Sequence, residues 1–111
     1  EERGIIAYDV LVNQCNMSAV DFMKLVSENP AKLYGMYPKK GTLAVGSDGD
    51  ITIVDKNVKH ILSIESAHTK ADYIPYEGLS VTGMVRDVIL RGHHVVQDGS
   101  LIESYLGECI P

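Results

Sequence analysis

Apolar and polar residues follow a helical pattern through the first third of the chain. Ser18 and Asp21 are spaced as in a capping box, because a serine hydroxyl can accept the amide three residues later while a carboxylate faces the positive end of the helix. One apolar face follows at helical spacing, made of Ala19, Phe22, Met23 and Val26. The pattern predicts a helix that starts at Ser18 and half covers another surface.

A second, short helix is predicted over residues 30–34. Asn29 is a good N-cap, Pro30 is tolerated at the first helical position, and Gly35 supplies a left-handed stop. Upstream, residues 5–12 are apolar on too many sides for a surface helix. We therefore expect residues 5–12 to be buried or to pack against something outside this chain.

After Pro38 the pattern changes from helical to alternating or continuously β-branched. The predicted strands are residues 51–54, 58–64, 85–90, 93–97 and 101–103. Arg91 and Gly92 form the turn of a hairpin, and Asp98 and Gly99 close it. Residues 65–78 are polar and aromatic, which indicates an ordered excursion. The fold class predicted is α+β, with helices first and antiparallel strands after them.

Composition limits the possible partners. The 111 residues carry a formal charge of −5, with 45% hydrophobic and 23% charged residues, which is typical of one globular domain. No basic cluster exceeds the pair Lys39 and Lys40, so we expect neither nucleic acid nor a membrane as partner. Cys15 and Cys109 lie at opposite ends of the chain, which favours free thiols and a cytoplasmic location. The start lacks an initiator Met, which indicates a fragment or a processed piece.

The four histidines do not have metal-binding spacing. Two imidazoles share a face when they are two apart on a strand or four apart on a helix, and none of the pairs among His60, His68, His93 and His94 meets this condition. His93 and His94 are adjacent on a predicted strand, so they point to opposite faces. We expect all four to be structural or exposed residues.

Other reactive residues also have structural interpretations. Ser47 lacks the Gly-x-Ser-x-Gly elbow of a nucleophile, and Cys15 has no evident base. The carboxylates Asp48, Asp50 and Asp55 lie around one predicted strand, and the run 46–50 is an ordinary polar turn before it. The segment 39–41 matches no phosphate-binding loop. The sequence therefore predicts no catalytic, substrate-binding or metal-binding residue in this chain.

Residues 41–55 resemble a motif of the amidohydrolase superfamily. In that motif Gly, a spacer, Gly-x-Asp-Ala-Asp and a β-branched strand ending in Asp introduce a small β domain, and here Gly49 replaces the usual Ala. The hairpin 88–99 is similar to the closing strands of that domain. A narrower resemblance, to hydantoinases and dihydropyrimidinases, is carried by residues 66–68, 72–73, 76–78 and the tail 107–111.

This resemblance implies a larger enzyme. Residues 1–40 correspond to the last helices of a (β/α)8 barrel, and residues 41–111 to the C-terminal strands and tail of an incomplete composite β-sandwich domain. Such enzymes open cyclic amides with a binuclear zinc centre, whose ligands all lie upstream of the matched part. The family commonly forms homotetramers.

Two alternatives to a hydrolase stay open at this point. Collapsin response mediator proteins resemble hydantoinases but serve assembly roles without catalysis. A free-standing β-rich binding module fits less well, because strands are missing and the chain begins with helices. Under the leading interpretation, we expect the isolated chain to be inactive and, because apolar faces and a sheet edge are exposed, to self-associate.

Overall fold

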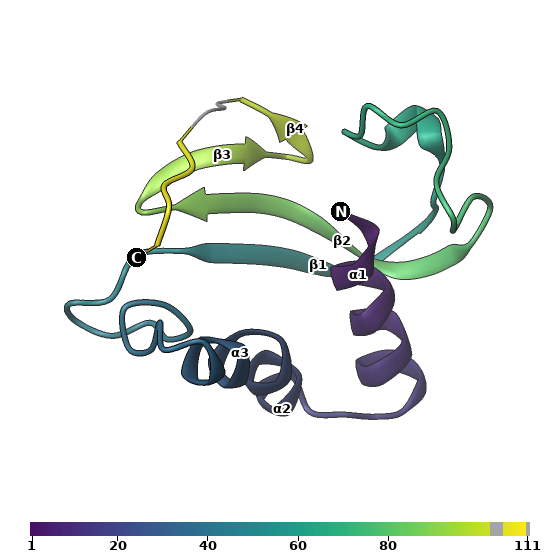
Figure 1. The fold of residues 1–111 in the computed structure, drawn as a ribbon. Helices are drawn as coiled ribbons and strands as arrows, with labels where there is room; N and C mark the ends of the chain where they lie inside the picture. Colours follow the sequence, from purple (N-terminus) through teal and green to yellow (C-terminus); the bar gives the residue numbers. More distant parts are fainter. Residues whose placement is uncertain (103–105, 111) are drawn as a thin grey trace.

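Two helical stretches precede a four-stranded antiparallel sheet in the computed structural model, which describes residues 1–102 and 106–110 (Figure 1). The first stretch joins α1 (Glu2–Tyr8) to a π-helical segment, η1 (Asp9–Gln14). The second joins α2 (Ala19–Met23), the π-helical η2 (Lys24–Glu28) and α3 (Asn29–Leu33). The predicted order of helices and then antiparallel strands is confirmed.

The second helical stretch begins as predicted but does not restart where expected. The Ser18 hydroxyl oxygen accepts the Asp21 backbone N–H at 3.0 Å, which confirms the cap. Asn29 is not an N-cap, because its backbone has φ −65° and ψ −44° and continues the helix. A π turn is wider than an α turn, so η2 relieves the clash that Pro30 would otherwise make inside a helix. Gly35, with φ +70°, ends the stretch as predicted.

The sheet has the order β1-β2-β3-β4, and every neighbouring pair is antiparallel. Its strands are β1 (Ile51–Ile61), β2 (Ser80–Leu90), β3 (His93–Gln97) and β4 (Ser100–Leu101). The hairpin through Arg91 and Gly92 is confirmed, with Leu90 opposite His93. Glu103, the predicted end of the last strand, lies outside the described residues.

β1 is one strand and not two, so the prediction of separate strands at 51–54 and 58–64 was wrong. The register against β2 shifts between Asp55 and Lys59, which marks an irregularity in a continuous strand. A polar run in a sequence is the same signal for a bulge and for a turn, which explains the error. The strand ends at Ile61, and Ile64 already belongs to a short 3₁₀ helix, η3 (Ile64–Ser66).

The main hydrophobic core is small and lies between the first helix and one end of the sheet. Its buried members are Ile5, Leu62, Ile74 and Val81. Ile74 comes from the excursion after η3 and packs into this core. Residues 5–12 are covered only in part, because Ile5 is buried whereas Val10 remains 40% exposed.

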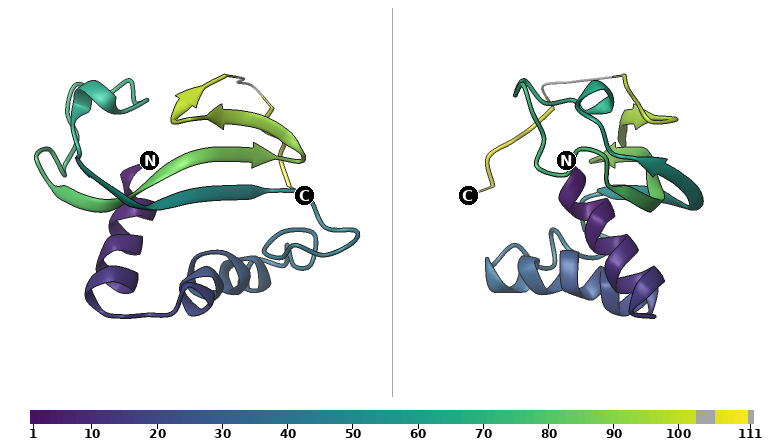
Figure 2. Two further views of the ribbon diagram at one scale, coloured as in Figure 1. Left: turned by 180° about the vertical axis from the view of Figure 1, so that it is seen from behind. Right: turned by 90° about the vertical axis from the view of Figure 1, so that its right-hand side faces the viewer.

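The second helical stretch keeps its apolar side chains largely uncovered. It lies next to β1, at the end of the strand order opposite β4, as Figure 1 and both views of Figure 2 show. Val20, Met23, Leu25 and Val26 are each exposed by 43% to 58%. Among the described residues, no helix combines the length and apolar character that crossing a bilayer requires.

Candidate functional site

The four histidines lie apart. His93 and His94 are exposed on β3, opposite Leu90 and Ile89 of β2. His60 lies on β1 opposite Val81, whereas the Nδ1 atom of His68 is 2.8 Å from a carboxylate oxygen of Glu1. Within residues 1–102 and 106–110, no three side chains of the His, Cys, Asp or Glu type are grouped closely enough to hold a metal ion.

The candidate nucleophiles have structural roles or stand alone. The Ser47 hydroxyl donates a hydrogen bond to the carbonyl oxygen of Pro38 at 2.7 Å, so this side chain fixes a turn. Cys15 and Cys109 are free thiols, and both are exposed. Asp55 accepts the backbone N–H of Asn57 at 3.0 Å, a local contact within the irregular part of β1.

Asp48 and Asp50 do come together, and Lys40 joins them. The Lys40 ammonium lies 2.9 Å from a carboxylate oxygen of Asp48 and also contacts Asp50. The other oxygen of Asp50 accepts the backbone N–H of Arg91 at 2.9 Å. We call Lys40, Asp48, Asp50 and Arg91 the ion cluster; it fastens the Gly-rich turn before β1 to the turn between β2 and β3.

Burial and hydrogen bonds shift the pKa values of Asp50 and Lys40 in the ion cluster. Burial alone would raise the pKa of Asp50, but the hydrogen bonds from Lys40 and from the Arg91 backbone outweigh it and lower that pKa. The hydrogen bond to Asp50 in turn raises the pKa of Lys40. Both shifts favour the charged forms, so the cluster acts as a fastening and not as an acid or base near neutral pH.

Acid is therefore expected to loosen the fold. The pKa of Asp50 is lowered from its ordinary value of 3.8, so its contribution to stability is complete above pH 3.8 and is lost as the pH falls through the lower, folded-state pKa. Thermal unfolding should show a Tm that declines below this pH, with a shallower decline in Asp50→Asn. Equal declines in the two proteins would contradict the assignment.

The end of the chain returns to the ion cluster. The guanidinium of Arg91 donates to the carbonyl oxygen of Leu106 and lies 3.2 Å from a carboxylate oxygen of Glu108. A small cavity of about 320 Å³ separates this returning segment from Lys39, Lys40 and Leu90. Acidic and basic groups are balanced here, so the cavity shows no excess charge that would attract a particular ion.

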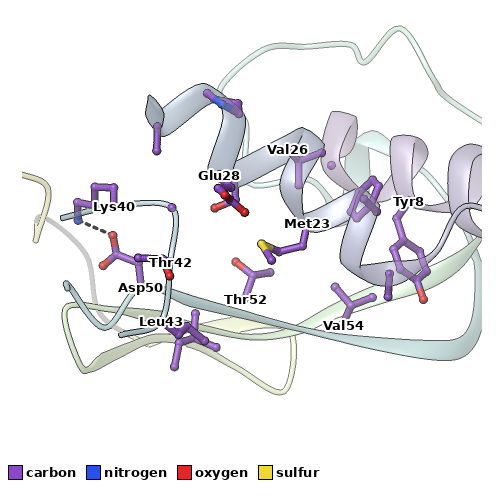
Figure 3. Close-up of a pocket in the computed structure, with 18 of the residues that line it drawn as sticks. Tyr8, Met23, Val26, Glu28, Lys40, Thr42, Leu43, Asp50, Thr52 and Val54 are labelled. Carbon is purple, nitrogen blue, oxygen red and sulfur yellow. Dashed lines mark hydrogen bonds and ion pairs between the residues drawn. The ribbon is translucent and has the colours of Figure 1, made fainter. Parts of the chain in front are cut away.

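A larger cavity lies between the second helical stretch and β1. It measures about 940 Å³, and its apolar lining includes Tyr8, Phe22, Met23, Val26, Val54 and Val85. Figure 3 shows Met23 and Val26 facing Thr52 and Val54 across the space, with the Lys40 and Asp50 pair at one end. A lining of this kind, without convergent catalytic groups, is suited to holding apolar side chains of a packing partner.

Next to this cavity, β1 also has an edge with unpaired backbone groups. It is at one end of the strand order, and among the described residues it pairs only with β2. A long edge strand presents unpaired N–H and C=O groups that readily bind another strand. The cavity and this edge together form a candidate interface, in which polypeptide from outside these 111 residues can pack.

Known proteins resemble the chain over nearly its whole length. The profile of the Amidohydrolase family matches residues 2–95. The D-hydantoinase of Ralstonia pickettii is 42% identical over 108 residues, which are 97% of this chain and 22% of that protein. Protein unc-33 of Caenorhabditis elegans is 35% identical over 104 residues, which are 94% of this chain and 12% of that protein.

Solved structures give the same result. A D-hydantoinase (dihydropyrimidinase) from Thermus sp. matches with a TM-score of 0.89 and 33% identity. The match covers 94% of this chain and 23% of the Thermus chain. This chain thus spans less than a quarter of the length of the hydantoinases that it matches, and both its helices and its sheet have counterparts there.

Proposed function

This chain belongs to the amidohydrolase family, and on that premise we propose that it is the C-terminal structural part of a cyclic-amide hydrolase of the hydantoinase and dihydropyrimidinase type. The observation that carries the proposal is the match of almost the entire chain to D-hydantoinases in both sequence and structure. In its intact form the protein would open the ring of hydantoins or dihydropyrimidines by hydrolysis.

The division of the chain follows from the same proposal. Residues 1–40 would be the last helices of a (β/α)8 barrel, and residues 41–111 the closing strands and tail of a composite β-sandwich domain. The large cavity and the open edge of β1 support this division, because both need further polypeptide to cover them. Until they are covered, we expect the isolated chain to self-associate through its exposed apolar residues.

The chemistry is proposed to reside elsewhere in the polypeptide. A binuclear zinc centre needs clustered histidines and carboxylates, and the described residues offer no such cluster. The residues present therefore do not fit the metal, and we assign no catalytic step to them. What this chain supplies is packing surface and the ion cluster that holds the sheet in shape.

We also propose a cytoplasmic homo-oligomer. Two exposed free thiols suit a reducing compartment. Closed point-group symmetry is usual for such oligomers, and a tetramer is our specific expectation. Neither nucleic acid nor a membrane is proposed as a partner.

The test is an assay of the longest natural polypeptide that carries these residues. We expect it to hydrolyse hydantoin or dihydrouracil and to contain stoichiometric metal, both lost after chelation. If it binds metal but turns over neither compound, the substrate class is wrong. If it neither binds metal nor turns over either compound, an assembly role without catalysis replaces the hydrolase proposal.

A further inference from the structure

The first helix makes an unusual contact with the backbone of β2. A carboxylate oxygen of Asp9 accepts the N–H of Thr82 at 3.2 Å. The side-chain amide of Asn13 donates to the carbonyl oxygen of the same Thr82 at 2.8 Å. One acceptor and one donor, four residues apart on a helix, thus satisfy both backbone groups of one strand residue, as a neighbouring strand would do.

The position of Thr82 in the sheet explains why these groups are available. Thr82 stands opposite Lys59 of β1. In an antiparallel pair both backbone groups of a residue point to the same side, and those of Thr82 point away from β1 to the helix. In the part of the chain that the structure describes, β3, the other neighbour, pairs with β2 at Val88, Ile89 and Leu90. Thr82 therefore lies on a stretch of β2 that β3 does not reach.

The lack of a side chain at Gly83 lets the first helix lie close enough to β2 for this contact. Gly83 has φ +123°, and a Cβ atom there would lie 3.0 Å from side-chain carbons of both Ile5 and Tyr8. Asp9 is only 8% exposed, and it also accepts hydrogen bonds from Asn13 at 2.8 Å and from Gln14 at 3.0 Å. The two amides thus orient the carboxylate toward the strand.

We propose that Asp9 and Asn13 form an edge cap on β2, which takes the place of a β-strand at Thr82 and directs further strand pairing to β1. A capped edge cannot accept another strand at that point, whereas Lys59, opposite Thr82, turns its own backbone groups toward the open side of β1. The partner at β1 is an extended segment of the remaining polypeptide. This second half rests on the proposed function, whereas the cap itself does not.

The cap is tested by exchanging its two members. The double variant Asp9→Asn/Asn13→Asp keeps composition, charge and size, but it places a carboxylate against the carbonyl oxygen of Thr82. Amide hydrogen exchange of Thr82, measured in the longest natural polypeptide, should become faster by roughly tenfold or more. The milder Asn13→Ala, which keeps the Asp9 acceptor, should give a smaller increase.

A control variant and the amide of Lys59 test the cap and the strand pairing at β1 separately. Asp72→Asn removes a carboxylate from an exposed residue outside the cap and should leave the exchange of the Thr82 amide unchanged. Unchanged Thr82 exchange in both cap variants would overturn the cap. The Lys59 amide should exchange slowly in the longest natural polypeptide. Rapid Lys59 exchange in that polypeptide would overturn the direction of strand pairing and the proposed architecture, while a tenfold effect at Thr82 would still support the cap.

Discussion

Replacing Gly41 by Ala is expected to destabilise the fold by about 2–5 kcal/mol. Gly41 has φ +83°, and an added Cβ atom would lie 2.5 Å from the Cβ of Ala31 and 3.1 Å from the carbonyl oxygen of Ser27. Both obstacles belong to the second helical stretch, where Ala31 is only 3% exposed. Because neither can move like the end of a flexible side chain, the loop would have to leave the helix.

The expected loss has two parts, which a second glycine separates. Gly46 also has a left-handed backbone, with φ +93°, but no atom lies within 4 Å of the added Cβ position. Gly46→Ala should therefore cost only the conformational part, about 1–2 kcal/mol. Urea unfolding of both variants gives the comparison through the midpoint and slope. Equal losses would mean that the contact between Gly41 and Ala31 does not matter.

Replacing Lys40 by Met should cost about 2–3 kcal/mol. The side chain of Lys40 is 15% exposed and contacts both Asp48 and Asp50. Methionine has similar length but no charge, so the two carboxylates would face each other without a counter-ion. We expect the turn before β1 to loosen from the turn at Arg91, and the unfolding midpoint in urea to fall.

The adjacent lysine is the matched control. Lys39 carries the same charge but is exposed, so Lys39→Met should change the free energy of unfolding by no more than about 0.5 kcal/mol. A second check is pH, because the loss caused by Lys40→Met should shrink once Asp50 is protonated. Similar losses in both lysine variants would show that general charge, and not the ion cluster, is responsible.

Local signals in the sequence predicted the parts of the fold that depend on neighbouring residues. The cap at Ser18 needs only Asp21 three residues later, and the hairpin turn needs only Arg91 and Gly92. The error at Asn29 has a different origin, because a wider helical turn can absorb a proline that otherwise marks a boundary. That widening depends on backbone geometry, which residue preferences do not encode.

Local sequence patterns could not predict contacts between residues that are distant in the chain. In the sequence, Lys40 is only the second residue of a short basic pair. In the structure, it contacts both Asp48 and Asp50. The pairing of Asp9 with Thr82 joins residues 73 positions apart, and nothing in the spacing of Asp9 and Asn13 indicates a strand as their partner. The family resemblance, in contrast, rests on short motifs within this chain, and the comparisons confirmed it.

Hydantoin hydrolysis by three proteins tests the central claim most directly. These are the longest natural polypeptide that carries these residues, the same polypeptide truncated before Glu1, and this chain alone. If the chain completes the fold without supplying chemistry, only the first protein turns over hydantoin. Turnover by the 111 residues alone would contradict the placement of the active site elsewhere, and full activity of the truncated polypeptide would contradict a structural need for this chain.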